Sequence, residues 1–399
     1  MKYKKFEPGE RYYSHNYNIP KEVKFCKVCV ISNQRPRITF NSEGVCSACA
    51  FTDLKEKIDW AKREKELSTL LDKHRKHDGS YDVIVPSSGG KDSGYVAHQL
   101  KYIYKMNPLT VTWAPHIYTE IGFQNQRSHI NVADLSNIML TPPGKLHRKL
   151  SRLALKIIGD PFMPFIIGQM NVPLQIAKLY NIPLIFYGEN NELEYGRGIK
   201  DPERDSANTN ISVRFPQLFS GVFPHKFIEA GITKSELKYY LGLDEVDLKK
   251  INPQVHYFGY YKKWLPQENY YYCVDNTGFK PNPVRTEGTY SKFASLDDKL
   301  DGFHYYLMFI KFGIGRATSD AAHEVRDGRL SREEAVELVA KYDSEFPKKY
   351  YKDFLEYCDI TEEEFNNMLD SWRPSHIWRK SNTGEWLLKH TINHSGTDD

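Results

Sequence analysis

A strand–turn–helix segment with a Ser/Gly-rich turn constrains the fold more than any other stretch of the chain. The apolar run Val83–Val85 leads into Ser87–Gly90, and a helical pattern follows directly from Lys91. Two glycines let the backbone bend tightly and turn its N–H groups outward, and the positive end of the helix dipole adds to their attraction for anions. The segment therefore predicts a phosphate-binding loop at the carboxyl end of a strand.

The side chains of this turn suit a phosphate with a magnesium ion. Lys91 can neutralise phosphate oxygens, and Asp92, an acid in a phosphate site, suits a Mg²⁺ ligand. A Walker-type loop would have Gly where Val85 stands and Ser or Thr where Asp92 stands, so kinase-like or GTPase-like chemistry is disfavoured. The residues predicted to bind the phosphates are Ser88, Gly89, Gly90, Lys91, Asp92 and Ser93.

Strand-like and helical stretches alternate along much of the chain. The strand-like runs are residues 82–86, 109–113, 137–141, 183–187 and 255–261. Helical segments separate at least the first four, and one of them is expected at Asn171–Tyr180 with Pro173 in its first turn. This alternation predicts an α/β fold with a mostly parallel, Rossmann-like sheet whose ligands bind beyond the carboxyl ends of the strands.

The last third of the chain is expected to be mainly helical. Three capping boxes, which begin at Thr233, Ser331 and Thr361, predict helix starts, whereas residues from about Asn382 onward indicate an irregular tail. We therefore expect three regions. These are a cysteine-containing module at 1–60, a nucleotide-binding domain at 61–265 and a mainly helical region at 266–399 that completes the substrate site.

Four of the six cysteines form two CxxC pairs. They are Cys26, Cys29, Cys46 and Cys49, whereas Cys273 and Cys358 stand alone. Four thiolates satisfy tetrahedral Zn²⁺, and each two-residue spacer lets one tight turn present two sulfurs. The pattern predicts a structural zinc site, with an iron–sulfur cluster or free thiols as the alternatives. One charged amphipathic helix over residues 51–76 is expected to lead from this module into the sheet.

Composition limits the partners and the location. Lys and Arg number 55 against 51 for Asp and Glu, and the resulting net charge of +4 requires no nucleic-acid partner. No stretch is long and apolar enough to span a bilayer, and the polar residues after Met1 contain no signal-peptide core. We expect a cytoplasmic enzyme without membrane insertion.

Two further segments concentrate polar side chains. GENNELEYG follows the fourth expected strand, so Glu189, Glu192 and Glu194 lie where a sheet presents side chains to a ligand, unless they are surface acids at a helix start. Residues 285–339 interleave polar groups with aromatic rings, which suits a sugar-like ligand and equally suits a hydrogen-bonded helical scaffold. The candidate substrate contacts in the two segments are Asn190, Tyr195, Glu287, Tyr290, Asp298, His304 and Arg316.

These motifs together resemble a known family. SGGKDS resembles the SGGxDS signature of the PP-loop ATP pyrophosphatase superfamily. With the paired CxxC knuckles, the GEN segment and EGTYSKFASLDDKLDGFHYY…FGIGRATSDA, the chain is similar to the WbpG/PseA-like N-acetyl sugar amidotransferases over residues 26–378. One departure is Asn191, where we expect Gly in the family. Asn tolerates a glycine backbone conformation next best.

The resemblance implies a reaction. ATP would adenylate the amide oxygen of an N-acetyl sugar, free or nucleotide-activated, and ammonia would then displace AMP to leave an acetamidino sugar. Such sugars belong to bacterial surface-polysaccharide, including lipopolysaccharide, or nonulosonic-acid biosynthesis. ATP would be the co-substrate, Mg²⁺ its metal and Zn²⁺ a structural ion.

The resemblance also implies roles for individual residues. The implied catalytic residues are Lys91, Asp92, Glu189, Glu192 and Glu194. Lys91 would stabilise the developing pyrophosphate, and either Glu192 or Glu194 would be the general base. Gly188 would complete the ATP site, and Trp113 would flank the adenine unless it is a plain core residue.

The ammonia source is expected to be a separate protein. The two isolated cysteines lie on no nucleophile elbow and residue 2 is Lys, so no glutaminase site is recognisable. The resemblance implies a HisH-like glutaminase with a HisF-like subunit that passes ammonia across. A tRNA thiolation enzyme is an alternative, disfavoured because no cysteine lies between Cys49 and Cys273. A second alternative is a zinc-ribbon scaffold that binds nucleotide without catalysis, but such a scaffold would not need Asp92 together with Glu189 and Glu192.

Overall fold

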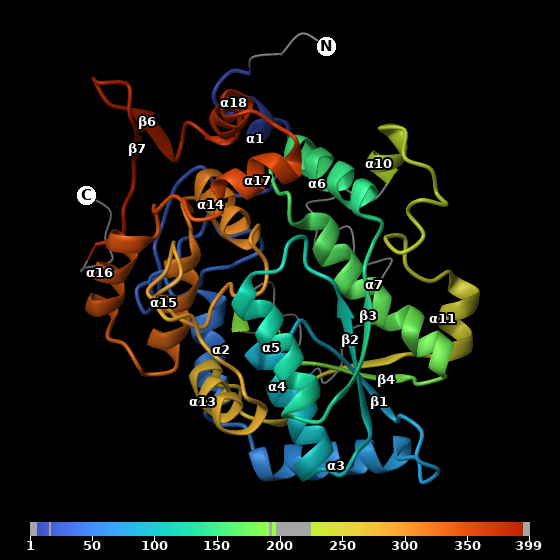
Figure 1. Ribbon diagram of the computed structural model, residues 1–399. Helices are drawn as coiled ribbons and strands as arrows, with labels where there is room; N and C mark the ends of the chain where they lie inside the picture. The colour runs from blue at the N-terminus through green and yellow to red at the C-terminus, as the bar shows by residue number, and fades with distance from the viewer. Residues whose placement is uncertain (1–5, 16, 191–193, 197–224, 394–399) are drawn as a thin grey trace.

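The main sheet of the molecule consists of five parallel strands (Figure 1). A computed structural model describes residues 6–15, 17–190, 194–196 and 225–393. The strands, in the spatial order β3-β2-β1-β4-β5, are β1 (Val83–Pro86), β2 (Pro108–Trp113), β3 (Ser136–Leu140), β4 (Leu184–Tyr187) and β5 (Gln254–Tyr257). The predicted parallel α/β fold is confirmed. The last strand is shorter than expected because residues 258–261 turn into α12 (Phe258–Tyr261).

Both faces of the central strand β1 are buried, and each face belongs to a different hydrophobic cluster. Val83 and Val85 pack in the cluster that contains residues of α3 (Trp60–His74) and α4 (Lys91–His98). Ile84, between them, packs with residues of α6 (Gly144–Ile158) and α7 (Met163–Tyr180). Successive side chains of a strand point to opposite faces, so a strand covered on both sides is apolar at every position.

The strand order reverses between the two central strands. From β1 the chain proceeds to β2 and β3 on one side, and it then returns to β4 and β5 on the other. Such a reversal leaves a crevice at the carboxyl ends of the central strands. The predicted phosphate loop follows β1 and the acidic segment follows β4, so the topology brings both to this crevice.

Two expectations about helices are wrong. Residues 51–76 form α2 (Ser47–Lys55) and α3 instead of one helix, because the Asp59 side chain accepts a hydrogen bond from the Lys62 N–H at 3.0 Å and starts a new helix there. The helix expected from Asn171 begins at Met163, so Pro173 lies inside α7. Because α7 is buried against β1, β2 and β4, its packing outweighs the backbone hydrogen bond that Pro173 cannot make.

The carboxyl-terminal region is mainly helical, as predicted. Its helices are α13 (Pro266–Thr277), α14 (Asp301–Phe312), α15 (Arg316–Arg326), α16 (Arg332–Tyr342), α17 (Tyr351–Cys358) and α18 (Glu362–Trp372). The capping boxes of α16 and α18 are both present. The box at Thr233 forms its hydrogen bonds with Glu236 but caps only a turn between α10 (His225–Glu229) and α11 (Glu245–Ile251). The expected tail instead begins with a hairpin of β6 (Trp378–Lys380) and β7 (Trp386–Leu388).

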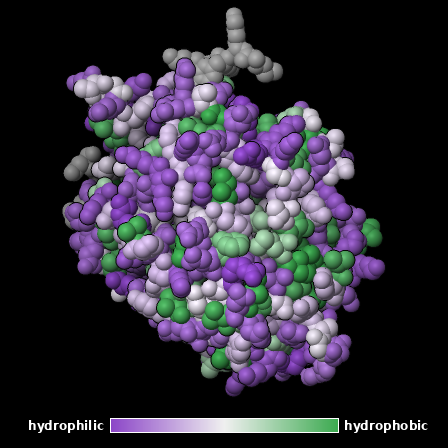
Figure 2. Space-filling view, in the orientation of Figure 1, coloured by the Kyte–Doolittle hydropathy of each residue, from purple (hydrophilic) through white to green (hydrophobic). Residues whose placement is uncertain are grey.

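The chain segments predicted as separate domains share a continuous core. One hydrophobic cluster includes the four amino-terminal cysteines, residues of β1 and β2, and residues of α14 and α18. The short helix α1 (Glu10–Ser14) packs on α18, so the amino-terminal segment lies against the carboxyl-terminal region (Figure 1). The face in Figure 2 is mostly hydrophilic, with apolar residues in small groups. No described helix is long and apolar enough to cross a membrane.

Candidate active site

The phosphate loop is a compact turn that its own serines hold in shape. The Ser87 hydroxyl lies 3.0 Å from the Ser93 hydroxyl, which in turn donates to the Gly90 carbonyl at 3.1 Å. Gly89 has φ +92°, and a Cβ there would fall 2.7 Å from the backbone nitrogen of Gln126 in α5 (Glu120–Asn131). Only glycine therefore permits both the turn and its close approach to α5.

A cleft of about 360 Å³ opens beside this loop. Residues 88–92, Glu189 and Tyr195 line it from the sheet. Ser291, residues 293–297 and side chains of α14 and α15 line it from the carboxyl-terminal region. Arg35 of the cysteine module completes the lining. The cleft therefore lies where all three predicted regions meet.

Two carboxylates face the cleft next to the loop. The Lys91 ammonium donates to both carboxylate oxygens of Asp92 at 2.7 Å. Burial and the nearby charge of Asp92 raise the pKa of Glu189 to about 7. Mg²⁺ takes one or two carboxylates together with phosphates and water, so Asp92 and Glu189 fit such an ion. Apart from the four cysteines, no cluster of three or more metal-ligating side chains occurs among the described residues, so the phosphates would have to supply further ligands.

Glu194 was predicted as a general base, and its surroundings contradict this. Its carboxylate is buried, accepts hydrogen bonds from Lys55 at 3.0 and 3.2 Å, and lies 3.4 Å from His323. Burial alone would raise the pKa of Glu194, but His323 and Lys55 outweigh it and lower the pKa to about 2. Such a carboxylate is a weak proton acceptor near neutral pH. Glu192, the other candidate, lies outside the described residues.

Three more predicted residues do not line the cleft. Trp113 is 2% exposed and packs beside Gly168 of α7, so the structure supports the core alternative rather than contact with adenine. Gly188 lies under Trp264, whose ring would be 2.7 Å from a Cβ at that position. Its small size thus allows Trp264, which does line the cleft, to pack. The backbone carbonyl of Asn190 accepts a hydrogen bond from the Glu194 N–H at 2.9 Å, and Asn190 is not among the residues that line the cleft.

The predicted substrate residues divide into two groups. Tyr195, His304 and Arg316 line the cleft, where Asp160 accepts from His304 at 3.0 Å and Asp320 pairs with Arg316 at 2.9 Å. The other four, Asn190 among them, lie elsewhere.

Asp298, Glu287 and Tyr290 do not line the cleft, and the structure gives a reason for each. Asp298 is buried and accepts from the His116 and Leu300 N–H groups at 2.6 and 2.9 Å. Glu287 accepts from the Lys349 N–H at 3.0 Å and lines a separate cavity of about 450 Å³. Tyr290 packs against the hydrophobic core.

Sequence reasoning missed several residues of the cleft. Asp297 lines it while the neighbouring Asp298 points away. Burial, followed by the nearby Asp301, raises the pKa of Asp297 to about 7. Asp320 and Glu324 of α15 also line the cleft. Adjacent acids are visible in the sequence, but which of them faces a ligand depends on the path of the backbone.

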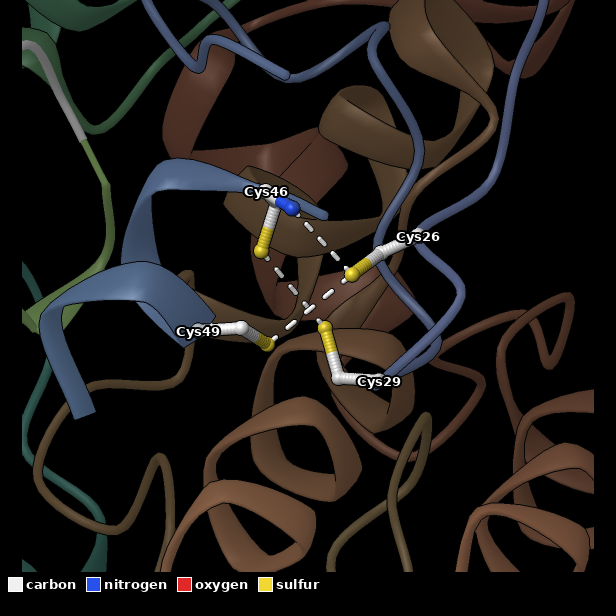
Figure 3. Close-up of side chains that lie close together, drawn as sticks. All are labelled: Cys26, Cys29, Cys46 and Cys49. Carbon is white, nitrogen blue, oxygen red and sulfur yellow. Dashed lines mark hydrogen bonds between the residues drawn. The ribbon is translucent and has the colours of Figure 1, made fainter. Parts of the chain in front are cut away.

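The four amino-terminal cysteines converge on one point (Figure 3). The sulfurs of Cys26 and Cys49 are 3.9 Å apart, those of Cys29 and Cys46 are 3.8 Å apart, and all four lie within 4.8 Å of one another. Zn–S bonds of ~2.3 Å in a tetrahedral shell put sulfurs about 3.8 Å apart. Backbone N–H groups of Val28 and Cys46 also point at the Cys26 sulfur, at 3.4 and 3.3 Å. The set fits a zinc ion.

Comparison with known proteins identifies the carboxyl-terminal region. Residues 287–392 match the family model described as "LPS biosynthesis protein WbpG-like, C-terminal domain". This region is similar to that carboxyl-terminal domain, and we call residues 287–392 the WbpG-like domain. The predicted relationship to WbpG-like proteins is thereby confirmed. Helices α14 and α15 belong to the WbpG-like domain, so this domain and the phosphate loop line the same cleft.

Two individual proteins are also similar to the chain. An uncharacterized protein of Methanocaldococcus jannaschii is 38% identical over 88 residues, which are 22% of this chain and 31% of that protein. The chain thus matches about a third of the length of this curated relative. An NH3-dependent NAD synthetase from Campylobacter jejuni aligns with 57% of this chain and 100% of its own, with 15% identity and a TM-score of 0.26.

Proposed function

We propose that this protein is an ATP-dependent amidotransferase that converts the acetamido group of a sugar into an acetamidino group. One observation carries the proposal: an SGGKDS loop and a WbpG-like domain line the same cleft. The loop suits a nucleotide phosphate. The name of the matching family points to lipopolysaccharide biosynthesis as the process.

In this proposal the loop binds the phosphates of ATP, and the reaction cleaves ATP into AMP and pyrophosphate. The amide oxygen of the sugar attacks the α-phosphorus, and the α–β bond breaks to release pyrophosphate onto residues 88–93. Lys91 neutralises the departing oxygens, and Asp92 with Glu189 would hold a Mg²⁺ that offsets their charge. Ammonia adds to the activated carbon, loses a proton and expels AMP, which carries away the amide oxygen.

Asp297 is the residue we propose to accept the proton from ammonia. It replaces Glu194, whose carboxylate is occupied by Lys55 and His323. Asp297 lines the cleft beside Ser88 of the loop, and its pKa of about 7 matches a base that works near neutral pH. Tyr195, His304 and Arg316 are the proposed sugar contacts.

The ammonia donor remains a proposal inferred from the sequence. We propose a separate HisH-like glutaminase with a HisF-like subunit, because neither isolated cysteine is placed for catalysis. Both Cys273 and Cys358 are fully buried, and burial raises the pKa of each thiol to about 12. A buried thiol of high pKa is unreactive.

The burial of Cys273 also argues against a role in tRNA thiolation. Cys273 lies beside the phosphate loop and its thiol donates to the Lys91 carbonyl at 3.0 Å. Because that sulfur is buried and protonated, it is poorly suited to carry sulfur to a nucleic acid. Sugar amidation is the function that the cleft supports best.

The deciding experiment is ATP turnover with ammonium chloride and a panel of free and nucleotide-linked N-acetyl sugars. We expect sugar-dependent AMP and pyrophosphate, with a product about 1 Da lighter in mass spectrometry because NH replaces O. Formation of ADP would contradict the mechanism. AMP formation that depends on tRNA and not on sugar would favour thiolation.

A further inference from the structure

Buried hydrogen bonds join the acidic segment that follows β4 to the cysteine module. Lys55, the last residue of α2, donates to both carboxylate oxygens of Glu194 at 3.0 and 3.2 Å and to the Trp264 carbonyl at 2.9 Å. The Lys55 and Glu194 side chains are only 5% and 7% exposed. Buried charges are stable only when paired and hydrogen-bonded, so this contact specifies one relative position of the two segments.

Two further contacts join the same pieces. The Ser47 hydroxyl, at the start of α2, donates to the Gly196 carbonyl at 2.8 Å. Gly196 has φ +66°, and a Cβ there would lie 2.7 Å from the Ser47 oxygen. The guanidinium of Arg35, another residue of the module, lies over the Tyr195 ring at 4.9 Å, and both residues line the cleft.

The WbpG-like domain also contacts Glu194, through α15. His323 of α15 lies 3.4 Å from the Glu194 carboxylate, and Arg326 donates to the Glu194 carbonyl at 2.8 Å. The Arg326 side chain also lies within electrostatic range of Cys29, Cys46 and Cys49. Glu194 is therefore held between α2 and α15, next to the cysteine site.

We propose that metal binding by the four cysteines is coupled to ligand binding in the cleft, with Lys55 as the positioning residue. Cys46 caps α2 and Cys49 lies in its first turn, whereas Lys55 ends it, so an ion on the two cysteines fixes the helix that holds Glu194. The same segment carries Glu189 and Tyr195 into the cleft. Coupling between two sites is reciprocal, so a ligand in the cleft must also strengthen metal retention.

This inference extends the proposed function and rests only on its nucleotide-binding part. The first test is backbone hydrogen exchange of peptides over residues 184–190, before and after zinc is removed with a chelator. We expect faster exchange there, while the β2 peptide 108–113 stays protected. Unchanged exchange at 184–190 would overturn the proposal, whether or not the enzyme amidates a sugar.

The second test isolates Lys55 in the zinc-loaded protein. Lys55→Met alone leaves the buried Glu194 carboxylate with only His323 beside it, so the double variant Lys55→Met/Glu194→Gln, which removes both charges, is the better test. We expect faster exchange at 184–190 in the double variant, with normal zinc content. Lys57→Met, at an exposed position just after α2, serves as the control and should match the wild type.

The third test measures the reciprocal effect. Zinc loss to a coloured chelator is followed with and without a non-hydrolysable ATP analogue and Mg²⁺. We expect the analogue to slow zinc loss about fivefold or more in the wild type and in Lys57→Met, and much less in the double variant. Equal slowing in the double variant would contradict the role of Lys55. An analogue that binds without changing zinc loss in the wild type would overturn the coupling itself.

Discussion

At the scale of single residues, the two glycines of the phosphate loop differ in what they require. Gly89 combines a positive φ with a close approach to the Gln126 backbone, whereas Gly90 has φ −74° and space up to the Ser88 hydroxyl at 3.4 Å. Sequence alone makes the pair look equivalent. The packing of α5 against the loop makes only the first strictly necessary.

Replacement of Gly89 by Ala should therefore abolish nucleotide binding and destabilise the protein. The left-handed backbone alone costs a residue with a Cβ about 1–2 kcal/mol, and the clash with Gln126 adds to it. Gly79→Ala, with φ +81° and no atom within 4 Å, isolates the backbone cost. Urea unfolding and calorimetric ATP binding measure both effects. Equal losses in the two variants would rule out the clash as a cause.

Asp297 gives a second prediction at this scale. If it accepts a proton from ammonia, Asp297→Asn should lower kcat at least about 100-fold with little change in ATP binding. Because the working form is the carboxylate, activity should rise with pH through about 7 in the wild type. Asp301 helps to raise that pKa, so Asp301→Asn should move the rise to lower pH. A pH profile that does not move would exclude Asp297 as the group observed.

At the scale of elements, capping boxes predicted helix starts only where the following residues could pack. The boxes at Ser331 and Thr361 open α16 and α18, each of which buries an apolar side against the domain. Thr233 makes the same hydrogen bonds, yet a short turn follows it. Local hydrogen bonds satisfy a helix end, but packing stabilises a helix.

Removal of these caps should have unequal effects. Ser331→Ala should lower the free energy of unfolding by about 1 kcal/mol, because α16 loses the acceptor for its Glu334 N–H. Thr233→Ala should cost less, since no helix depends on it. Urea unfolding of the two variants measures the difference. A Thr233 variant as unstable as the Ser331 variant would show that the turn matters as much as a helix.

At the scale of the whole molecule, the cysteine module is part of the common core rather than an appendage. The cysteines share a hydrophobic cluster with the sheet and the WbpG-like domain. A metal ion there would stabilise the folded chain by its binding free energy. The sequence indicated the four cysteines as candidate ligands, but it did not indicate that Arg35 and Lys55 of the same module reach the cleft and its acidic segment.

Metal content and metal removal test this view. We expect one zinc per chain, no visible absorption of the iron–sulfur type, and a lower melting temperature after treatment with a chelator that zinc alone restores. Elemental analysis, an absorption spectrum and calorimetry give the answers. Iron together with visible absorption would indicate an iron–sulfur cluster at this site instead of zinc. An unchanged melting temperature would mean that the four thiols stabilise the fold without an ion.

The sequence by itself determined the features that depend on neighbours along the chain. The parallel strands, the phosphate turn and the four-cysteine set follow from runs of a few residues, because side-chain period, glycine spacing and ligand spacing are local properties. Only the tertiary structure decided which acidic side chains face the cleft. Glu194 is paired by Lys55, 139 residues away, and Asp298 by His116, 182 residues away, so in these two segments it is Glu189 and Asp297 that line the cleft. Desolvation and pairing set the charge and direction of a carboxylate, and both depend on segments that only folding brings together.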